Sequence, residues 1–236
     1  MFTALLAVFA GIFLFWALNV AEPMETALVG LQSTERVEVL SEPWLTFRPL
    51  NQDALQGFIF YPGGRVDARA YAPLARDLAE AGILVVIPSM PLNLAIFAPN
   101  SAQEIIDVYA DIDRWTIGGH SLGGTMSAAF IQSHPEQVQQ LILLAAYPAD
   151  SLAALDHLRV LSIYGTTDGL LPPAEIEAKR ALLPPDTVYL SIEGGNHGQF
   201  GWYGAQSGDN PATIDRASQQ GQTVEAVKEF LQIDGR

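Results

Sequence analysis

The chain has 236 residues, 49% of them hydrophobic, so it is long enough for one domain with a sizeable core. Its 26 acidic residues outnumber 12 basic ones and give a formal net charge of -14. This balance argues against a nucleic-acid partner, because neutralising phosphates requires clustered Lys and Arg. The chain has no cysteine, which excludes disulfide scaffolds, thiolate zinc sites and a cysteine nucleophile.

The N-terminal segment is apolar. Residues 2–21 carry no charged side chain, and as a helix they would be about 30 Å long, the thickness of a bilayer core. No Lys or Arg precedes Arg36, so the basic start of a typical signal peptide is missing. We therefore expect residues 1–25 to form a single N-terminal helix that anchors the protein in a membrane, and residues 26–236 to form the domain. A signal peptide of a secreted protein and a buried core helix are the alternatives.

The rest of the chain predicts antiparallel strands, followed by strands that alternate with helices. Residues 36–40 and 44–49 alternate apolar and polar side chains, as half-buried strands do. Apolar runs predict buried strands within residues 57–64, 83–88 and 157–169, and further strands are expected within residues 113–119, 138–148 and 187–195. Helical spacing predicts helices within residues 67–82, 101–110, 121–134, 173–184 and 213–232. We therefore expect an α/β domain: a mostly parallel twisted sheet with helices on both faces, antiparallel strands at its N-terminal edge, and no large lid.

One serine lies in a glycine-rich turn between a predicted strand and a predicted helix. Residues 119–123 read Gly-His-Ser-Leu-Gly, which matches the pattern G-x-S-x-G. A sharp strand-to-helix turn would project the oxygen of Ser121 above the sheet, and the glycines would avoid collisions with neighbouring backbone. The start of the helix would offer the Leu122 N–H to an oxyanion. The alternative is a chance match in an ordinary turn.

A serine nucleophile needs a base and an acid that orients the base, expected in the chain order Ser, Asp or Glu, His. Asp168 lies at the end of the strand predicted within residues 157–169, and His197 follows the last predicted strand. All three groups would then lie at the carboxyl edge of the sheet, where such folds place their sites. Glu193 competes with Asp168 as the acid, but the position of Asp168 fits a strand end better. Taken singly, Asp168 and His197 are also compatible with an ordinary turn or loop.

An oxyanion also needs a second donor. Residues 61–66, Tyr-Pro-Gly-Gly-Arg-Val, supply a loop at the end of the strand predicted within residues 57–64. In this loop the Gly64 N–H is the favoured donor, and the Arg65 N–H is the second choice. An ordinary Pro-Gly turn is the alternative. His120 neighbours Ser121, and for it we expect a structural or pocket-wall role.

Together these motifs resemble those of the α/β-hydrolases, over roughly residues 36–233. The resemblance is carried by GGHSLGG, IYGTTDGLLP, GGNHGQFGWYGAQSGD and the segment from FYPGGRVDARAYAP to VVIPSMP. More narrowly, the chain resembles small lidless bacterial members grouped with dienelactone-hydrolase-like proteins, although those proper use a cysteine nucleophile. The resemblance implies a serine hydrolase of the esterase or lipase type, which needs no metal or cofactor. In it His197 would take the proton of Ser121, Asp168 would hold the imidazolium, and the Leu122 and Gly64 amides would bind the oxyanion.

Two stretches are candidates for the substrate side. Residues 89–99 are nearly all apolar and would line an acyl pocket or a mouth facing the membrane, or instead pack on the core. Residues 196–211 are rich in Gly and aromatic side chains and would shape the pocket, or form a self-packed loop held by Asp209 and Asn210. The expected substrate contacts are Arg65, His120, Met90, Leu92 and Phe200.

The expected partner is therefore a small neutral or hydrophobic ester, since neither stretch carries an arginine cluster for an anionic substrate. An acyltransferase on the same triad and a hydrolase-like fold that only binds are the alternatives. The sequence leaves the acyl group, the leaving group and the oligomeric state open.

Overall fold

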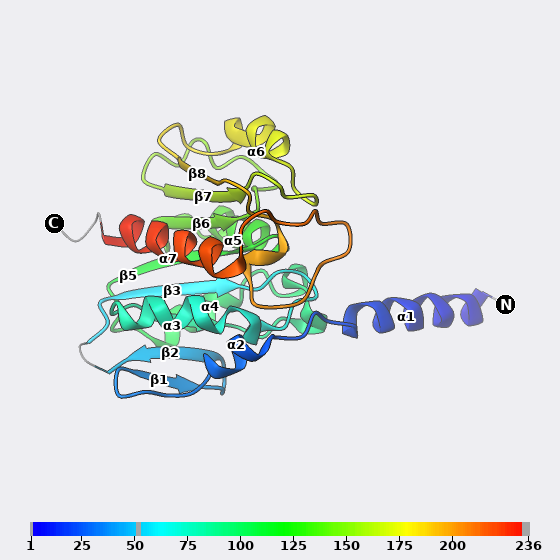
Figure 1. Ribbon diagram of the computed structural model, residues 1–236, viewed down its shortest axis with the longest axis horizontal. Helices are drawn as coiled ribbons and strands as arrows, with labels where there is room; N and C mark the ends of the chain where they lie inside the picture. The colour runs from blue at the N-terminus through cyan, green and yellow to red at the C-terminus, as the bar shows by residue number, and fades with distance from the viewer. Residues whose placement is uncertain (1, 51–52, 233–236) are drawn as a thin grey trace.

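The fold is built on one eight-stranded sheet (Figure 1). The computed structural model describes residues 2–50 and 53–232. In space the strands follow the order β1-β2-β4-β3-β5-β6-β7-β8. Their bounds are β1 (Val37–Leu40), β2 (Leu45–Pro49), β3 (Gln56–Tyr61), β4 (Leu84–Ile87), β5 (Arg114–His120), β6 (Gln140–Leu144), β7 (Arg159–Gly165) and β8 (Val188–Ile192).

Strand direction follows the hydrophobic pattern. β1 pairs with β2, and β2 with β4, in antiparallel fashion, whereas every other neighbouring pair is parallel. The alternating runs thus form the antiparallel edge, and the apolar runs of β3, β4 and β7 form buried strands, whereas the edge strand β8 is largely half-buried or exposed. The expected mixed sheet with antiparallel strands at its N-terminal edge is confirmed.

Helices cover both faces of the sheet, as expected (Figure 1). The α-helices are α1 (Phe2–Leu18), α2 (Glu25–Val29), α3 (Ala72–Glu80), α4 (Ser101–Val108), α5 (Leu122–Ser133), α6 (Pro173–Lys179) and α7 (Arg216–Gln232). Short 3-10 helices are η1 (Ala68–Tyr71), η2 (Pro91–Asn93), η3 (Ala95–Phe97), η4 (Arg180–Leu182) and η5 (Gly198–Phe200). Of the described elements, α3 and α7 pack on one face, and α4 and α5 pack on the other.

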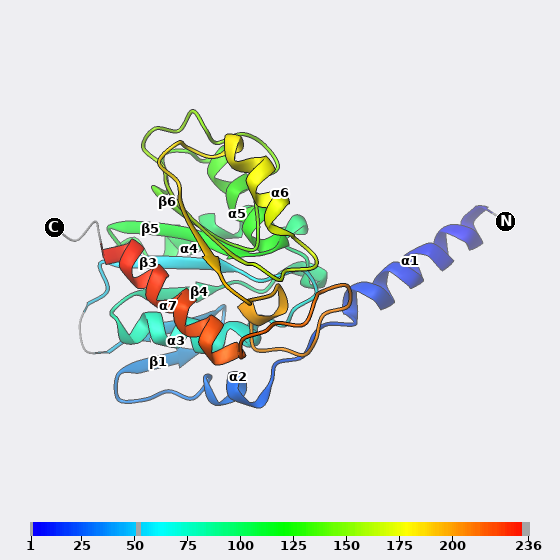
Figure 2. The same cartoon turned by 45° about the horizontal axis from the view of Figure 1, so that its top comes forward.

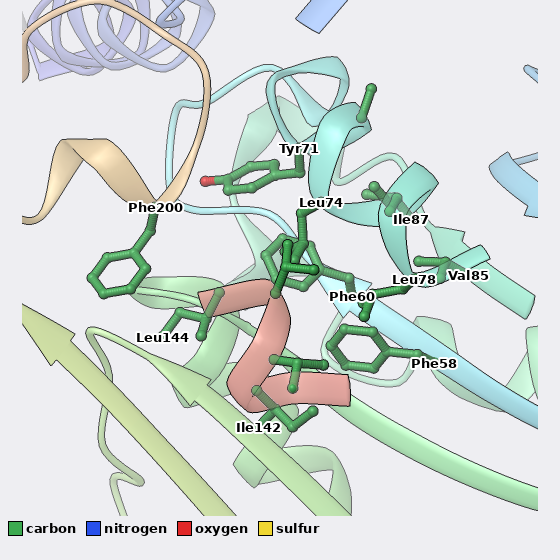
Figure 3. Packing of buried hydrophobic residues seen from close by; sticks show 14 of the residues in the cluster. Phe58, Phe60, Tyr71, Leu74, Leu78, Val85, Ile87, Ile142, Leu144 and Phe200 are labelled. Carbon is green, nitrogen blue, oxygen red and sulfur yellow. The ribbon is translucent and has the colours of Figure 1, made fainter. Parts of the chain in front are cut away.

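The core is divided by the two-residue period of the central strand. Phe58 and Phe60 of β3 join the cluster under α3 and α7, which also contains Tyr71 and Phe200 (Figure 3). Ile59 and Tyr61 of the same strand join the cluster under α4 and α5. Because successive side chains of a strand point to opposite faces, one apolar run serves both cores. This double burial holds the central strands rigidly and fixes the loops at their carboxyl ends.

Helix α1 projects away from the domain in both views (Figures 1 and 2). Its 17 residues carry exposed apolar side chains, among them Phe9, Ile12 and Phe15. Among residues 2–50 and 53–232, no helix is both long enough and apolar enough to pass through a membrane. The membrane anchor expected from the sequence stays a prediction.

The apolar stretch of residues 89–99 forms the two short helices η2 and η3 rather than one longer helix. Leu94 and Ala95 are buried, whereas Ile96 and Phe97 are exposed, and the ring of Phe97 meets that of Phe13 from α1 edge to face with centroids 6.3 Å apart. The stretch is thus partly core and partly a surface beside α1.

Candidate active site

Ser121 occupies the turn between β5 and α5 with a strained backbone. Its φ of 52° and ψ of -123° lie in a backbone region that residues other than glycine rarely adopt. A Cβ atom added to Gly119 or Gly123 would lie 2.4 Å or 2.1 Å from the carbonyl oxygen of Tyr61, well inside contact distance. The two glycines therefore have the steric role expected of them, because the turn must pass close to the end of β3.

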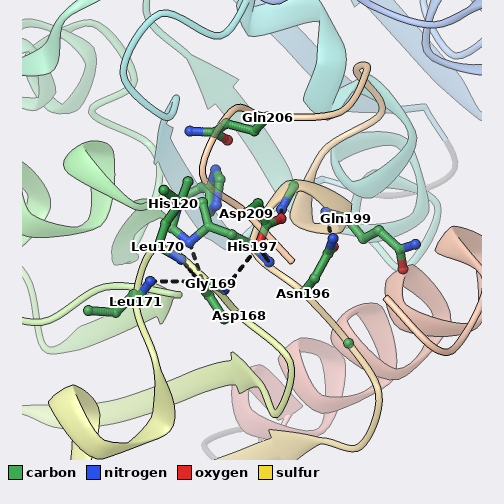
Figure 4. Close-up of polar contacts among 12 residues, drawn as sticks. His120, Asp168, Gly169, Leu170, Leu171, Asn196, His197, Gln199, Gln206 and Asp209 are labelled. Carbon is green, nitrogen blue, oxygen red and sulfur yellow. Dashed lines mark hydrogen bonds and ion pairs between the residues drawn. The ribbon is translucent and has the colours of Figure 1, made fainter. Parts of the chain in front are cut away.

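Asp168 and His197 form a buried pair (Figure 4). The Nδ1 atom of His197 lies 2.8 Å from Oδ2 of Asp168, and each residue is 2% exposed. The other oxygen of Asp168 accepts the backbone N–H groups of Leu170 at 2.8 Å and Leu171 at 2.6 Å. The carboxylate is thus fixed by its own loop and in turn fixes the imidazole. Glu193, the competing acid, is exposed and takes no part in this pair.

The pairing sets which nitrogen of His197 is free. Because the carboxylate holds Nδ1, the Nδ1 atom carries a proton and Nε2 can accept one. Nε2 is buried and has no hydrogen-bond partner among the described residues. An imidazole in this state is a general base whose acceptor nitrogen is available to a nearby hydroxyl.

Ser121 and His197 line the same cavity, which has a volume of about 380 Å³. The described residues that line it carry no carboxylate, ammonium or guanidinium group. They are Ser121, Leu122, Thr125, Ala145, Ala146, Tyr147, Leu170, Leu171 and His197. Its walls come from the carboxyl ends of β5, β6, β7 and β8, and no helix or strand among the described residues interrupts the connection from β6 to β7. No large lid is therefore present in the described part of the chain, as the sequence predicts.

The two expected oxyanion donors lie on neighbouring segments. The Leu122 N–H begins α5, where backbone amides have no partner within the helix. A Cβ added to Gly64 would lie 3.2 Å from the Cδ2 atom of Leu122, so the loop after β3 passes close to this helix start. Arg65, the second choice, donates its N–H to the carbonyl oxygen of Asn93 at 2.8 Å and is committed to that contact.

Several of the expected substrate contacts lie away from the cavity. Arg65 turns towards the N-terminal segment: its guanidinium lies 4.6 Å from the ring centroid of Trp16 and donates to the Asn19 carbonyl at 2.6 Å. Met90 lines a different cavity, of about 200 Å³, and Leu92 adopts a positive φ of 53° in η2. None of these three residues is among those lining the cavity beside Ser121.

His120 and Phe200 are buried and do not line the cavity beside Ser121. The ring centroid of His120 lies 4.6 Å from that of His197 and 5.8 Å from that of Phe200. His120 ends β5 with its side chain on the face that carries Tyr71. The wall of the cavity is made instead by residues such as Thr125 and Tyr147, which the sequence motifs did not predict. The position of Tyr147 in the sequence could have indicated it, because Tyr147 follows β6 at the same edge of the sheet.

Buried hydrogen bonds link His120 to the loop after β3. The Gly63 N–H donates to the Tyr71 hydroxyl at 3.0 Å, and that hydroxyl lies 2.9 Å from Nδ1 of His120. The Tyr71 oxygen accepts from Gly63, and its O–H group can donate to Nδ1 of His120. Burial, together with the nearby His197, holds the pKa of His120 well below its usual value, so the ring is neutral and can accept. Gly63 precedes Gly64, so these hydrogen bonds fix the loop that carries the expected oxyanion donor.

The comparisons with known proteins agree with this architecture. The profile described as the alpha/beta hydrolase family matches residues 57–221. No match is found among curated proteins. An alpha/beta hydrolase from the metagenome of sediments of the Mar Chica lagoon in Morocco superposes with a TM-score of 0.64 and 14% identity, covering 86% of this chain and 100% of its own.

Two esterases superpose in a similar way. The esterase Est2 of Thermogutta terrifontis gives a TM-score of 0.58 and 17% identity, covering 90% of this chain and 95% of its own. Est1E of Butyrivibrio proteoclasticus, with ferulic acid bound, gives 0.60 and 14%, covering 84% and 96%. At these identities the superpositions establish the shared fold, and the profile covers well over half of the chain. The mixed sheet, the strained turn at Ser121 and the profile match lead to one conclusion: the chain belongs to the alpha/beta hydrolase family.

Proposed function

We propose that this protein is a serine hydrolase that cleaves carboxylic esters through an acyl-enzyme. The proposal rests chiefly on one observation: His197, held by Asp168 at 2.8 Å, lines the same cavity as the strained Ser121. The names of the structural neighbours support it, since two of them are esterases.

In the proposed reaction, Ser121 Oγ attacks the ester carbonyl carbon while His197 Nε2 takes the hydroxyl proton. The carbonyl electron pair moves onto oxygen, and the N–H groups of Leu122 and Gly64 stabilise the resulting oxyanion. The C–O bond to the alcohol then breaks as His197 returns the proton to the leaving oxygen. Water attacks the acyl-enzyme by the same steps in reverse, which releases the acid and restores Ser121.

The cavity supports a small neutral substrate. Its walls carry no fixed charge among the described residues, so no ion pair is offered to an anionic acyl group. Its volume of about 380 Å³ lies near the low end of the roughly 300–1,000 Å³ found for ligand pockets. We therefore expect short acyl chains to react faster than long ones.

A series of p-nitrophenyl esters of increasing acyl length tests the proposal. The expected result is turnover by the wild type that is highest for short chains and is absent in Ser121→Ala. Adding a primary alcohol and analysing products separates hydrolysis from acyl transfer, because a transferase would release mainly the new ester. Equal turnover by wild type and Ser121→Ala would refute the proposal.

A further inference from the structure

A second carboxylate, that of Asp209, lies next to the Asp168–His197 pair (Figure 4). It belongs to the segment between η5 and α7 and accepts four backbone N–H groups. Its Oδ1 atom accepts from Gly169 at 3.0 Å, His197 at 3.3 Å and Asn210 at 2.9 Å, and its Oδ2 atom accepts from Gly198 at 2.8 Å. Hydrogen bonds to an ionised carboxylate are stronger than those between neutral groups, so the Asp209 side chain holds these backbone segments firmly.

Three of these N–H groups, those of Gly169, His197 and Gly198, belong to the two loops that carry the acid and the base, and the fourth, that of Asn210, follows Asp209 in its own segment. Gly169 directly follows Asp168 in the loop after β7, and His197 lies in the loop after β8. One carboxylate therefore connects both loops at the residues on which the 2.8 Å contact between Asp168 and His197 depends. β8 is an edge strand, so the loop after it has no further strand on its outer side to hold it.

The segment that carries Asp209 is fitted closely against the acid loop. A Cβ added to Gly169 would lie 2.6 Å from the N atom of Asn210 and 2.8 Å from the carbonyl oxygen of Gly208, so only glycine permits this approach. On the other side, Asn196 Nδ2 donates to the Asn210 carbonyl oxygen at 2.7 Å. The segment thus contacts both loops closely.

We infer that Asp209 is a positioning residue that holds the acid and base loops in register for catalysis. Among the described residues it accepts hydrogen bonds from backbone groups only, and it does not line the cavity beside Ser121. Its effect is to fix His197 against Asp168 before substrate binds, and misplacement of about 1 Å at such a site costs on the order of 100-fold in rate. The inference rests on the proposed function, because its kinetic consequence requires the triad to work.

Three variants and one control test this role. Asp209→Ala removes the carboxylate, and Asp209→Asn keeps one acceptor oxygen. Gly169→Ala leaves Asp209 intact and separates the two segments by steric contact. The control is Asp215→Asn, because Asp215 is an exposed carboxylate that also accepts a backbone N–H, that of Ser218 at 2.7 Å, but at the start of α7.

For each variant we would measure kcat and KM with p-nitrophenyl acetate, the melting temperature, and the proton NMR spectrum. The Nδ1 proton of an imidazole bonded to a carboxylate resonates far downfield and reports the His197–Asp168 contact directly. We expect Asp209→Ala and Gly169→Ala to lower kcat by about 10- to 100-fold with little change in KM, and to broaden or remove that resonance. Asp209→Asn should retain more activity than Asp209→Ala, and Asp215→Asn should keep wild-type kcat and resonance.

Wild-type kcat and resonance in folded Asp209→Asn and Gly169→Ala would overturn the inference, even if Asp209→Ala fails to fold. So would a loss of kcat in Asp215→Asn equal to that in Asp209→Asn, since the effect would then follow general stability. If the wild type turns over no ester, the proposed function fails instead. The resonance still decides the positioning role in that case, because its presence in the wild type and in Asp209→Ala alike would refute it.

Discussion

Removing the hydroxyl of Tyr71 tests whether the buried chain from Gly63 to His120 supports the active site. In Tyr71→Phe, the Gly63 N–H and His120 Nδ1 both lose their partner, at 3.0 Å and 2.9 Å, in a region closed to water. A buried polar group left unpaired costs roughly 1–3 kcal/mol, so two such groups amount to roughly 2–6 kcal/mol. For a domain of this size each kcal/mol lowers the melting temperature by about 2–4 °C.

The same change should reduce catalysis. Gly63 precedes the expected oxyanion donor Gly64, and loss of one such donor costs about 100- to 1,000-fold in kcat. A donor that is loosened rather than lost should cost less, so we expect a fall of roughly 10-fold with KM little affected.

The assay combines thermal melting with p-nitrophenyl acetate kinetics, and Tyr109→Phe serves as the control. The Tyr109 hydroxyl has no hydrogen bond in the part of the chain that the structure describes, so its removal should change neither quantity. A Tyr71→Phe protein with the melting temperature and kcat of the wild type would refute the reasoning.

Three further predictions concern the turn, the acid and the buried histidine. Ser121→Gly should abolish ester turnover yet raise the free energy of unfolding by about 1–2 kcal/mol in a urea titration, because glycine adopts φ 52° without strain; unchanged stability would contradict this. Asp168→Asn should lower kcat by about 10,000-fold, measured with p-nitrophenyl acetate, because an amide favours the wrong tautomer of His197; near-wild-type kcat would exclude Asp168 as the acid. His120 has a lowered pKa, so below about pH 6.5 the unfolded state binds its proton first and stability falls by up to about 1.4 kcal/mol per pH unit. Urea titrations at several pH values should show a shallower decline for His120→Gln, and an identical decline would mean that His120 does not contribute.

Much of the fold could be read from periodicity. The change from alternating to continuous apolar runs separated the antiparallel edge, β1 and β2, from the parallel strands that follow. The glycines at 119 and 123 predicted a close approach of backbone, and the carbonyl of Tyr61 is the group they approach. These features are local, or they follow from rules about neighbouring strands, so one sequence suffices to infer them.

Features that depend on tertiary packing were not predictable in this way. The aromatic residues of segment 196–211 indicated a pocket wall, but Phe200 and Tyr203 are buried in the core under α3 and α7. The contact of Tyr71 with His120 joins residues 49 positions apart, and no spacing rule anticipates it. The cavity walls at Thr125 and Tyr147 likewise become recognisable only when the sheet edge is assembled.

The most direct test of the central claim is labelling with a fluorophosphonate, followed by mass spectrometry of the peptides. The account predicts one adduct, on Ser121, that is lost in Ser121→Ala and formed more slowly in Asp168→Asn. A folded wild-type protein that takes up no label, or a Ser121→Ala variant labelled as fast as the wild type, would contradict it.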